Sequence, residues 1–230
     1  MTDFHIHLLP CMDDGAQSVA ESQVMLSLLA AQGVTSAVCT PHYFAEKEPA
    51  AQFLERRAQS YAQICQSAQT SGVTLALGAE ITMWQGMSGE ITDQFCLGDS
   101  NLLLCELPVS YGAWVIEELE ELSAQGYCPI IAHLDRVQAL YTDSQLASVL
   151  ECHGVAYQFN AASLCQARVR GLMRALHFVD ARLVLGSDGH GAKYRSPDFK
   201  GASKALAGFR MREVRERIEQ CDREFHRAIF

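Results

Sequence analysis

Two histidines near the start of the chain have the spacing of side chains that share one face of a β-strand. His5 and His7 lie two residues apart at the end of an apolar run. Because successive strand side chains alternate between faces, both imidazoles point to the same side and can reach one cation. A His-x-His pair alone is a weak signal, since a polar strand end explains it about as well. Other parts of the chain must decide between the two interpretations.

Metal-type side chains also follow the later apolar runs. They are His42, Glu80, Glu106, His133, Asp188 and His190. Carboxylates so close to apolar strands are costly unless they are paired or bind a metal. The set contains only imidazoles and carboxylates, which suit zinc, manganese or iron, and no Cys-x-x-Cys pair indicates a structural zinc. Many carboxylates favour more than one cation, and two cations about 3.5–4 Å apart can clamp a phosphoryl group and activate water.

The elements that must position these residues alternate along the whole chain. Strands are predicted at 2–6, 35–39, 73–77, 101–105, 129–132, 155–159 and 182–185. Amphipathic helices are predicted at about 18–32, 50–70, 112–125, 142–153 and 164–178, and a long charged helix at about 202–224, whereas 78–100 predicts no full helix. This alternation predicts a parallel α/β fold. Candidate ligands follow many strands instead of one switch point, which favours a closed barrel over an open sheet.

Length and composition narrow the class of protein. A chain of 230 residues with 49% hydrophobic and 20% charged residues predicts a single globular domain over 1–230. No apolar run is long enough to span a bilayer and no leader pattern is present, so we expect no membrane insertion. The nine cysteines are scattered and odd in number, which indicates free thiols in the cytoplasm. The net charge of −9 without a basic run argues against nucleic acid as a partner.

Six short segments carry a resemblance to a known family. They are Asp3-Phe4-His5-Ile6-His7, Asp13-Asp14-Gly15, Thr40-Pro41-His42, Gly78-Ala79-Glu80-Ile81, Ala132-His133-Leu134-Asp135-Arg136 and Ser187-Asp188-Gly189-His190. In order and spacing they resemble the PHP (polymerase and histidinol phosphatase) superfamily. Within it, they are most similar to the CpsB/CapC-type bacterial protein-tyrosine phosphatases of capsule and exopolysaccharide synthesis. The resemblance extends over about residues 1–200.

The resemblance implies a distorted (β/α)7 barrel of the PHP type with two or three divalent cations, often manganese, iron or zinc. It assigns one ion to His5, His7, Glu80 and Asp188, a second to Glu80, Glu106 and His133, and a third to Asp14, His42 and His190. It places phosphate-binding arginines at Arg136 and Arg195, and it alone prefers Asp14 over Asp13 as a ligand. Asp135 departs from the family's usual Glu and Leu134 from a frequent Pro, which affects an outer contact more than a ligand. Cys11 replaces a commoner Gly or Val.

The activity implied by this resemblance is hydrolysis of phosphotyrosine on a protein, with a bacterial tyrosine autokinase that controls polysaccharide export as the partner. Cations would activate water, and Arg136 and Arg195 would stabilise the phosphoryl oxygens. Two alternatives stay open. The same site could act on a small ester such as histidinol phosphate or a nucleotide, or the chain could be a non-catalytic metal-binding module that docks on a kinase. The complete ligand set favours catalysis.

A second phosphatase-like spacing occurs near the end of the sequence. Cys221 and Arg227 have the C-x5-R spacing of thiol-dependent tyrosine phosphatases. That chemistry needs a loop of small residues whose N–H groups cradle phosphate. This stretch is charged and helical in pattern, so we predict no such site. We expect His153 and His177 to be capping or surface residues, and His226 to be solvated.

Overall fold

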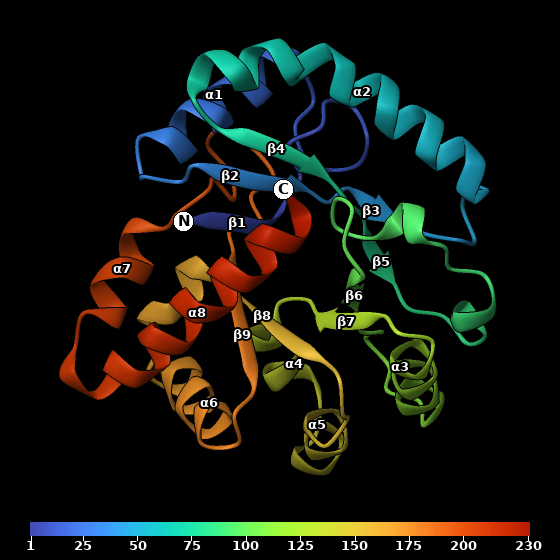
Figure 1. The fold of residues 1–230 in the computed structure, drawn as a ribbon, viewed down its shortest axis with the longest axis vertical. Helices are drawn as coiled ribbons and strands as arrows, with labels where there is room; N and C mark the ends of the chain where they lie inside the picture. The colour runs from blue at the N-terminus through green and yellow to red at the C-terminus, as the bar shows by residue number, and fades with distance from the viewer.

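The computed structural model describes residues 1–230 and contains a wall of parallel strands in seven positions, two of them interrupted (Figure 1). The uninterrupted strands are β1 (Thr2–Ile6), β6 (Leu102–Glu106), β7 (Cys128–Ile131), β8 (Ala156–Asn160) and β9 (Arg182–Gly186). The second position consists of β2 (Ser36–Cys39) and β3 (His42–Tyr43), and the third of β4 (Thr74–Leu77) and β5 (Glu80–Thr82). All seven predicted strands are confirmed, whereas β3 and β5 are too short to show a period in the sequence.

The two interruptions place site residues on short strands of their own. Pro41 follows β2 and has no N–H to donate to a sheet ladder. The chain nevertheless stays in register, because Gly78 N–H donates to the Cys39 carbonyl at 2.9 Å and Glu80 N–H to the Pro41 carbonyl at 3.0 Å. β3 then pairs with β5 at His42 and Glu80. The result is a bent wall that presents both side chains at the same end.

Contacts between the first and last strands close the barrel. Ile6 and Gly189 form a parallel bridge. The His7 N–H donates to the Gly189 carbonyl at 3.0 Å, and the Asp188 N–H donates to the His5 carbonyl at 2.8 Å. An open sheet would leave β1 and β9 apart at its edges. The predicted distorted (β/α)7 barrel is therefore confirmed.

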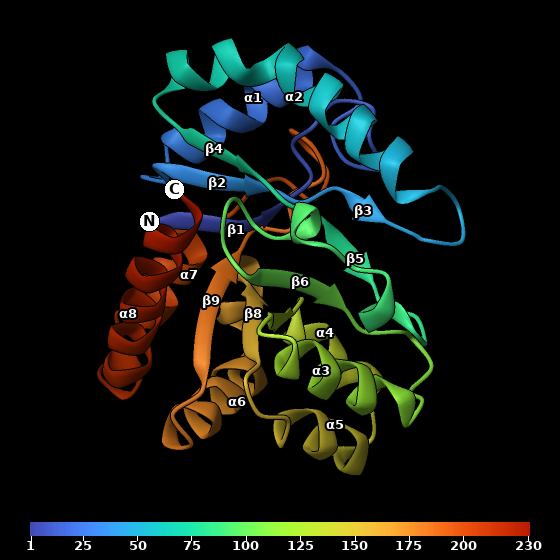
Figure 2. The ribbon, with the colours of Figure 1, turned by 45° about the vertical axis from the view of Figure 1, so that its right-hand side comes forward.

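Helices surround the barrel on its outer side (Figures 1 and 2). They are α1 (Val19–Ala30), α2 (Ala50–Ser71), α3 (Trp114–Ala124), α4 (Leu134–Leu140), α5 (Asp143–Leu150), α6 (Ala167–Phe178), α7 (Lys200–Leu206) and α8 (Arg212–Ile229). Short 3-10 turns occur at η1 (Met87–Gly89), η2 (Asp93–Phe95), η3 (Ala161–Cys165) and η4 (Phe209–Met211). The absence of a full helix over 78–100 is confirmed. The short helix α4 was not anticipated.

The prediction of one long helix at about 202–224 is wrong. The chain forms α7, the turn η4 and then α8, and the interruption occurs at Gly208, which has an extended conformation with ψ 143°. Glycine is a poor helix former because it loses more backbone freedom than other residues. Apolar residues of α8 at positions 214, 218, 221, 225 and 229 recur every three or four residues and are buried, which gives this helix its own apolar face.

The inside of the barrel is an apolar core that α8 closes at the end opposite the site. Phe225 of α8 packs edge-to-face on Phe4 of β1, with ring centroids 6.1 Å apart. Cys221 is fully buried in the same cluster, and burial raises the pKa of its thiol. A protonated thiol inside the core cannot be a nucleophile, which confirms that the C-x5-R spacing is incidental. No helix in the structure has the length and apolarity to cross a membrane.

Candidate metal centre

The nine predicted ligand residues come together at the C-terminal end of the barrel strands. They are His5 on β1, His7 and Asp14 after β1, His42 on β3, Glu80 on β5, Glu106 on β6, His133 after β7, and Asp188 and His190 after β9. Most are buried, while the Asp14 side chain is 67% exposed. Residues up to 185 positions apart in the sequence thus meet because each follows a strand of one parallel barrel.

The first group of donors surrounds the end of β1. The His5 and His7 Nε2 atoms lie 3.1 Å apart, and the Glu80 Oε2 atom lies 3.1 Å from His5 Nε2 and 3.2 Å from His7 Nε2. The Asp188 Oδ1 atom lies 3.7 Å and 3.6 Å from the same two nitrogens. Four donor atoms from three strands therefore face one point in a fully buried position.

A second group shares Glu80 with the first. The His133 Nε2 atom lies 2.8 Å from Glu80 Oε1 and 3.4 Å from Glu106 Oε1. The other oxygen of Glu106 accepts a hydrogen bond from the Thr82 hydroxyl at 2.7 Å. Because the two oxygens of Glu80 face different imidazoles, this carboxylate can bridge two neighbouring cations.

The third group lies nearer to solvent. The Asp14 Oδ1 atom lies 3.3 Å from His190 Nε2 and 3.7 Å from His42 Nε2. The donor atoms of these three residues and His7 all lie within 4.8 Å of one another. The His42 Nδ1 atom is also 3.1 Å from Glu80 Oε2, so the groups adjoin.

Several buried donor atoms in this centre have no hydrogen-bond partner. They are His42 Nδ1, Glu80 Oε2 and His190 Nε2. A buried polar atom without a partner costs about 1–3 kcal/mol, and natural proteins avoid such groups unless a ligand satisfies them. Imidazoles that face each other and a carboxylate, with their lone pairs free, fit divalent cations. Both the chemistry of these donor atoms and their arrangement therefore fit a site for divalent cations.

Two residues hold the first two histidines in place from behind. The His7 Nδ1–H donates to Asp13 Oδ2 at 2.7 Å, and the His5 Nδ1–H donates to Gln158 Oε1 at 3.1 Å. These bonds leave each Nε2 free to face the centre, as in other metal sites where an outer partner fixes the tautomer. The same Gln158 oxygen accepts the His133 N–H at 2.6 Å.

Asp13 is therefore an orienting residue, whereas its neighbour Asp14 lies among the donors. The Asp13 carboxylate also accepts N–H groups of His42 and Gly15, both at 2.8 Å. Burial would raise the pKa of Asp13, but these bonds and the His7 imidazole lower it far below the usual range. Burial would lower the pKa of His7, but the hydrogen bond to Asp13 and the nearby Glu80 carboxylate raise it to about 10 in the ion-free protein.

The polar contacts that close the barrel also support the centre. The Asp3 carboxylate accepts the Ser187 N–H at 2.8 Å and the Ser187 hydroxyl at 2.6 Å, and it accepts the His5 N–H at 3.2 Å. Burial raises the pKa of Asp3 to about 6, although the bonds from Ser187 act in the opposite direction. Asp3 thus joins β1 to the loop that carries Asp188.

Asp135, which stands where the family usually has Glu, uses both of its carboxylate oxygens in hydrogen bonds. One oxygen of Asp135 accepts the Asn160 N–H at 2.9 Å and the other accepts the Ser163 hydroxyl at 2.6 Å. The Asn160 amide then donates to Asp188 Oδ2 at 3.0 Å. The shorter acid therefore acts through the end of β8 and contacts no donor group directly.

Backbone conformation is unusual at three residues of the centre. His133, Asp188 and Arg195 have positive φ values of 31°, 51° and 47°. Such conformations cost of order 1 kcal/mol or more and tend to occur at functional sites. Residue 15 must be glycine because the backbone of His7 lies very close to it, and a Cβ there would lie 2.4 Å from the His7 carbonyl oxygen. These backbone conformations therefore reduce the stability of the fold in order to hold the centre in this arrangement.

The two predicted phosphate-binding arginines both contact Asp188. The Arg195 Nη2 atom lies 2.7 Å from Asp188 Oδ1, and Arg136 pairs with the other oxygen. Their side chains are 29% and 42% exposed, so the guanidinium groups line the entrance to the centre. Two guanidinium groups beside a cation centre suit a phosphoryl group, because each planar guanidinium can donate two parallel hydrogen bonds to its oxygens.

Two hollows flank the entrance. One of about 550 Å³ lies between α1 and the loop after β9, and Val24 and Tyr194 line it together with Asp14, His190 and Arg195. Val24 is 47% and Tyr194 81% exposed. The other, of about 440 Å³, adjoins His42 and contains Phe44, over which the Lys47 amine lies 3.6 Å from the ring centroid. The centre thus opens onto surfaces that mix apolar and charged groups.

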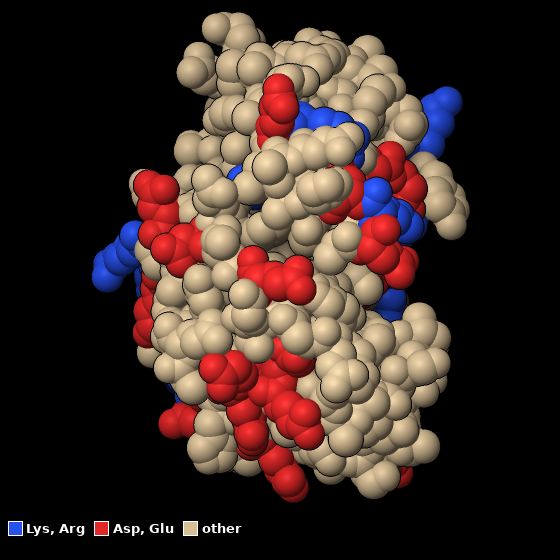
Figure 3. All heavy atoms as spheres, turned by 90° about the vertical axis from the view of Figure 1, so that its right-hand side faces the viewer, with Lys and Arg blue, Asp and Glu red and all other residues tan.

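Acidic side chains gather on the face shown in Figure 3. They lie over its lower part, at the height of α3, while the upper part mixes both signs. α3 contributes the exposed residues Glu117, Glu120 and Glu121. Such a surface repels a phosphate backbone.

Sequence reasoning missed the orienting residues Asp3, Asp13, Gln158 and Asn160. A signal for the last two was present, because both are polar residues on the same face of an otherwise apolar strand. The remaining histidines lie apart from the centre. His153 is exposed, His177 is half-buried 3.7 Å from Glu213, and His226 is half-buried with its ring 3.3 Å from the Thr2 hydroxyl.

The family of this chain follows from its match to a known protein family. The model of the family described as "Capsular polysaccharide synthesis, CpsB/CapC" matches residues 1–221. The chain belongs to the CpsB/CapC family. Among members with known roles, the tyrosine-protein phosphatase YwqE of Bacillus subtilis is 29% identical over 205 residues, which covers 85% of this chain and 80% of that protein. The tyrosine-protein phosphatase CpsB of Streptococcus pneumoniae is 28% identical over 224 residues, or 90% of each chain.

Solved structures agree with this family assignment at the level of the fold. A crystal structure from work on YwqE and CpsB, described as unique metal-dependent tyrosine phosphatases, superposes with a TM-score of 0.77 at 24% identity and covers 96% of this chain and 93% of that one. A TatD-like protein of Archaeoglobus fulgidus gives a TM-score of 0.50 at 14% identity and covers 98% of this chain and 100% of its own. The CpsB/CapC chain therefore shares its fold with both of these structures.

Proposed function

We propose that the chain is a metal-dependent protein-tyrosine phosphatase that acts on a bacterial tyrosine autokinase of capsule or exopolysaccharide synthesis. The observation that carries this proposal is the convergence of nine imidazole and carboxylate donors with two arginines at one open end of the barrel. Family relatives are named as tyrosine phosphatases, which supports the same chemistry here.

We assign the donors to two or three divalent cations of manganese, iron or zinc. His5, His7, Glu80 and Asp188 form one set, Glu80, Glu106 and His133 the second, and Asp14, His42 and His190 the third. Bound cations would supply Lewis-acid activation of water and neutralise charge on the phosphoryl oxygens. Glu80 is the carboxylate that two sets share.

The two arginines at the entrance can bind and orient the phosphoryl group. Arg136 and Arg195 can donate to phosphoryl oxygens and orient the ester. The tyrosyl leaving group has a pKa of about 10, so its departure needs less help from an acid than an alkyl oxygen does. No residue of this chain is assigned as a general acid.

The open entrance favours a protein over a small metabolite as the substrate. Asp14 is 67% and Arg136 is 42% exposed, and the 550 Å³ hollow beside Asp14 is lined by the exposed Tyr194. A phosphotyrosine on a chain must project into the centre while its neighbours stay outside. We infer that Tyr194 and Val24 contact the aromatic ring or an adjacent residue of that substrate. All nine cysteines are unpaired, which supports a reducing compartment, the cytoplasm, as the site of action.

The test compares metal content and turnover. We expect purified wild type to hold at least two cations per chain and to hydrolyse a phosphotyrosyl peptide with a higher kcat/KM than histidinol phosphate. The His5→Ala variant should lose cations and activity together. Tyr194→Ala should raise KM for the peptide several-fold and leave KM for histidinol phosphate unchanged.

The outcomes separate the alternatives. Preference for histidinol phosphate would replace the protein substrate with a small one. Bound cations without turnover on either ester would favour a non-catalytic docking module. A wild-type chain without cations would refute the metal centre itself.

A further inference from the structure

One edge of the barrel wall is open at β4. This strand pairs only with β2, and the bonds from Thr74 N–H to the Thr35 carbonyl and from Gly78 N–H to the Cys39 carbonyl show which residues face β2. In a parallel ladder the alternate residues, Leu75 and Leu77, face the opposite way. The Leu77 carbonyl accepts from Gly98 N–H at 2.7 Å, but the Leu75 N–H and carbonyl and the Leu77 N–H make no hydrogen bond to the protein.

The open edge exists because β6 begins too late to pair with β4. β6 starts at Leu102, and its first neighbour is β5, where Leu104 lies opposite Glu80. No full helix follows β5, so no helix from that connection covers the free edge of β4. Unpaired N–H and C=O groups of an edge strand are a template for another strand.

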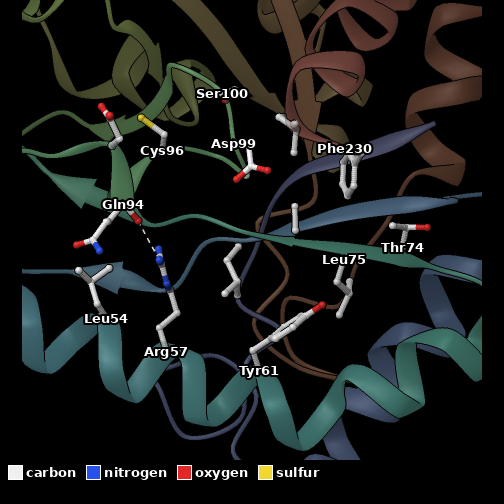
Figure 4. A pocket seen from close by; sticks show the side chains of 15 residues that line it. Leu54, Arg57, Tyr61, Thr74, Leu75, Gln94, Cys96, Asp99, Ser100 and Phe230 are labelled. Carbon is white, nitrogen blue, oxygen red and sulfur yellow. Dashed lines mark hydrogen bonds between the residues drawn. The ribbon is translucent and has the colours of Figure 1, made fainter.

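The edge lines a groove of about 890 Å³ (Figure 4). On one side, Leu54 and Tyr61 of α2 point into it, and on the other the segment 94–100 forms the wall. Leu75 and Phe230 lie at one end, and Arg57 lies at the other beside Gln94. The groove is thus long, partly apolar and parallel to β4.

A buried arginine without an anionic partner marks one end of this groove. Arg57 is 8% exposed and donates to the carbonyls of Gly78 and Gln94, both at 2.8 Å, while its Nε atom has no partner. No carboxylate lies within ion-pair distance of it, unlike its neighbour Arg56, which pairs with Glu48 at 2.8 Å. Burial lowers the pKa of Arg57 to about 10. A buried cation without a counter-charge is costly, and an anionic ligand would offset that cost.

We propose that this groove binds an extended segment of a protein partner, which adds a strand to β4 and sets one carboxylate against Arg57. The unpaired groups of Leu75 and Leu77 require an extended backbone, as in other complexes formed by strand addition. Apolar side chains at alternate positions would face Leu54 and Tyr61. Asp93 and Asp99 are exposed at the rim, so a second acidic residue there would be repelled.

This site is separate from the metal centre. None of the residues that line the groove is among the predicted ligands or phosphate-binding arginines. An added strand here would hold a partner while the mouth of the barrel stays free. The proposal does not depend on phosphatase activity and holds for any function of the centre.

The test uses synthetic peptides and the full chain. Fluorescein-labelled peptides of eight residues alternate valine and threonine and carry one aspartate, which is moved through the positions of the set. We expect saturable binding by fluorescence anisotropy for at least one peptide, weakened about tenfold or more when its aspartate is replaced by asparagine. N-methylation of alternate peptide amides should abolish binding without any change to the protein.

Protein variants and hydrogen exchange complete the test. Arg57→Gln should remove the preference for aspartate over asparagine, whereas the matched variant Arg56→Gln should keep it. The Leu75 and Leu77 amides should exchange quickly in the free protein and become protected by the peptide. The proposal is overturned if no peptide binds at millimolar concentration, if binding ignores both N-methylation and Arg57→Gln, or if the two amides are already protected in the free chain or by a second copy at high concentration.

Discussion

The substitution Asp13→Asn tests whether the centre depends on residues that orient its donors. Asp13 Oδ2 accepts from His7 Nδ1 at 2.7 Å and from His42 N–H at 2.8 Å, and Oδ1 accepts from Gly15 N–H at 2.8 Å. An asparagine keeps one acceptor oxygen and turns an NH₂ group toward the other donors. In the orientation that keeps most bonds, the amide oxygen accepts from His7 and His42, and the NH₂ group opposes the Gly15 N–H.

The size of the effect follows from these bonds. A hydrogen bond to a charged group contributes about 1.5–3 kcal/mol, so the loss of the Gly15 bond, together with the loss of the charge opposite His7, predicts a decrease of at least about 1.5 kcal/mol in the free energy of unfolding of the metal-free chain. Loss of the partner that fixes a ligand histidine costs about 10–100-fold in metal affinity. We expect both effects in Asp13→Asn.

The neighbouring residue provides the matched control. Asp14→Asn removes a donor whose side chain is 67% exposed and makes no hydrogen bond within the centre. It should weaken the binding of one cation and leave unfolding in EDTA unchanged. Urea titration in EDTA and competition with a chromophoric chelator measure the two quantities. An Asp13→Asn chain with wild-type stability in EDTA and metal affinity within twofold of wild type would refute this reasoning.

Two further results are expected from the pKa values of buried groups. Burial opposes the proton on His7, but the Asp13 and Glu80 carboxylates together outweigh it and raise the pKa to about 10 in the ion-free protein, above about 6.5 in an unfolded chain. Stabilisation by this proton is therefore full below pH 6.5 and is lost as the pH rises through about 10, so the melting temperature in EDTA should fall across that window. Calorimetry that shows a rise instead would contradict it. Iodoacetamide should label the exposed Cys11 and Cys165 in the native chain and leave phosphatase activity intact. Labelling of Cys221 with loss of activity, while cations stay bound, would show that a thiol takes part.

Residues differ in how well the sequence reveals their place in the fold. Strands of four or five apolar residues can be predicted from their composition. The polar side chains that follow them can then be predicted as metal ligands. His5, Glu106 and His133 are examples, because each comes at the end of such a run. Strands of two or three residues carry no period, which is why β3 and β5 were not predicted even though His42 and Glu80 on them were.

Orienting residues are harder to find because their partners are distant in the chain. Gln158 contacts His5 across 153 positions, and Asp3 contacts Ser187 across 184. The types of these residues do not reveal their partners, and only the closure of β1 onto β9 brings these pairs together. The same holds for Asp13 and Asp14, which are identical in type and adjacent in sequence. Backbone direction alone makes one an orienting group and leaves the other among the donors.

The alternation of strands and helices, the donor types and their places at strand ends can all be predicted from the sequence, because they depend on local pattern and on the chemistry of single side chains. The tertiary structure decided what depends on contacts between distant segments. It set the distances between donors, placed Arg136 and Arg195 on one carboxylate, buried Cys221 in the core, and left β4 with an open edge beside Arg57. Those features follow from how the barrel closes and where β6 begins, and no local pattern encodes either.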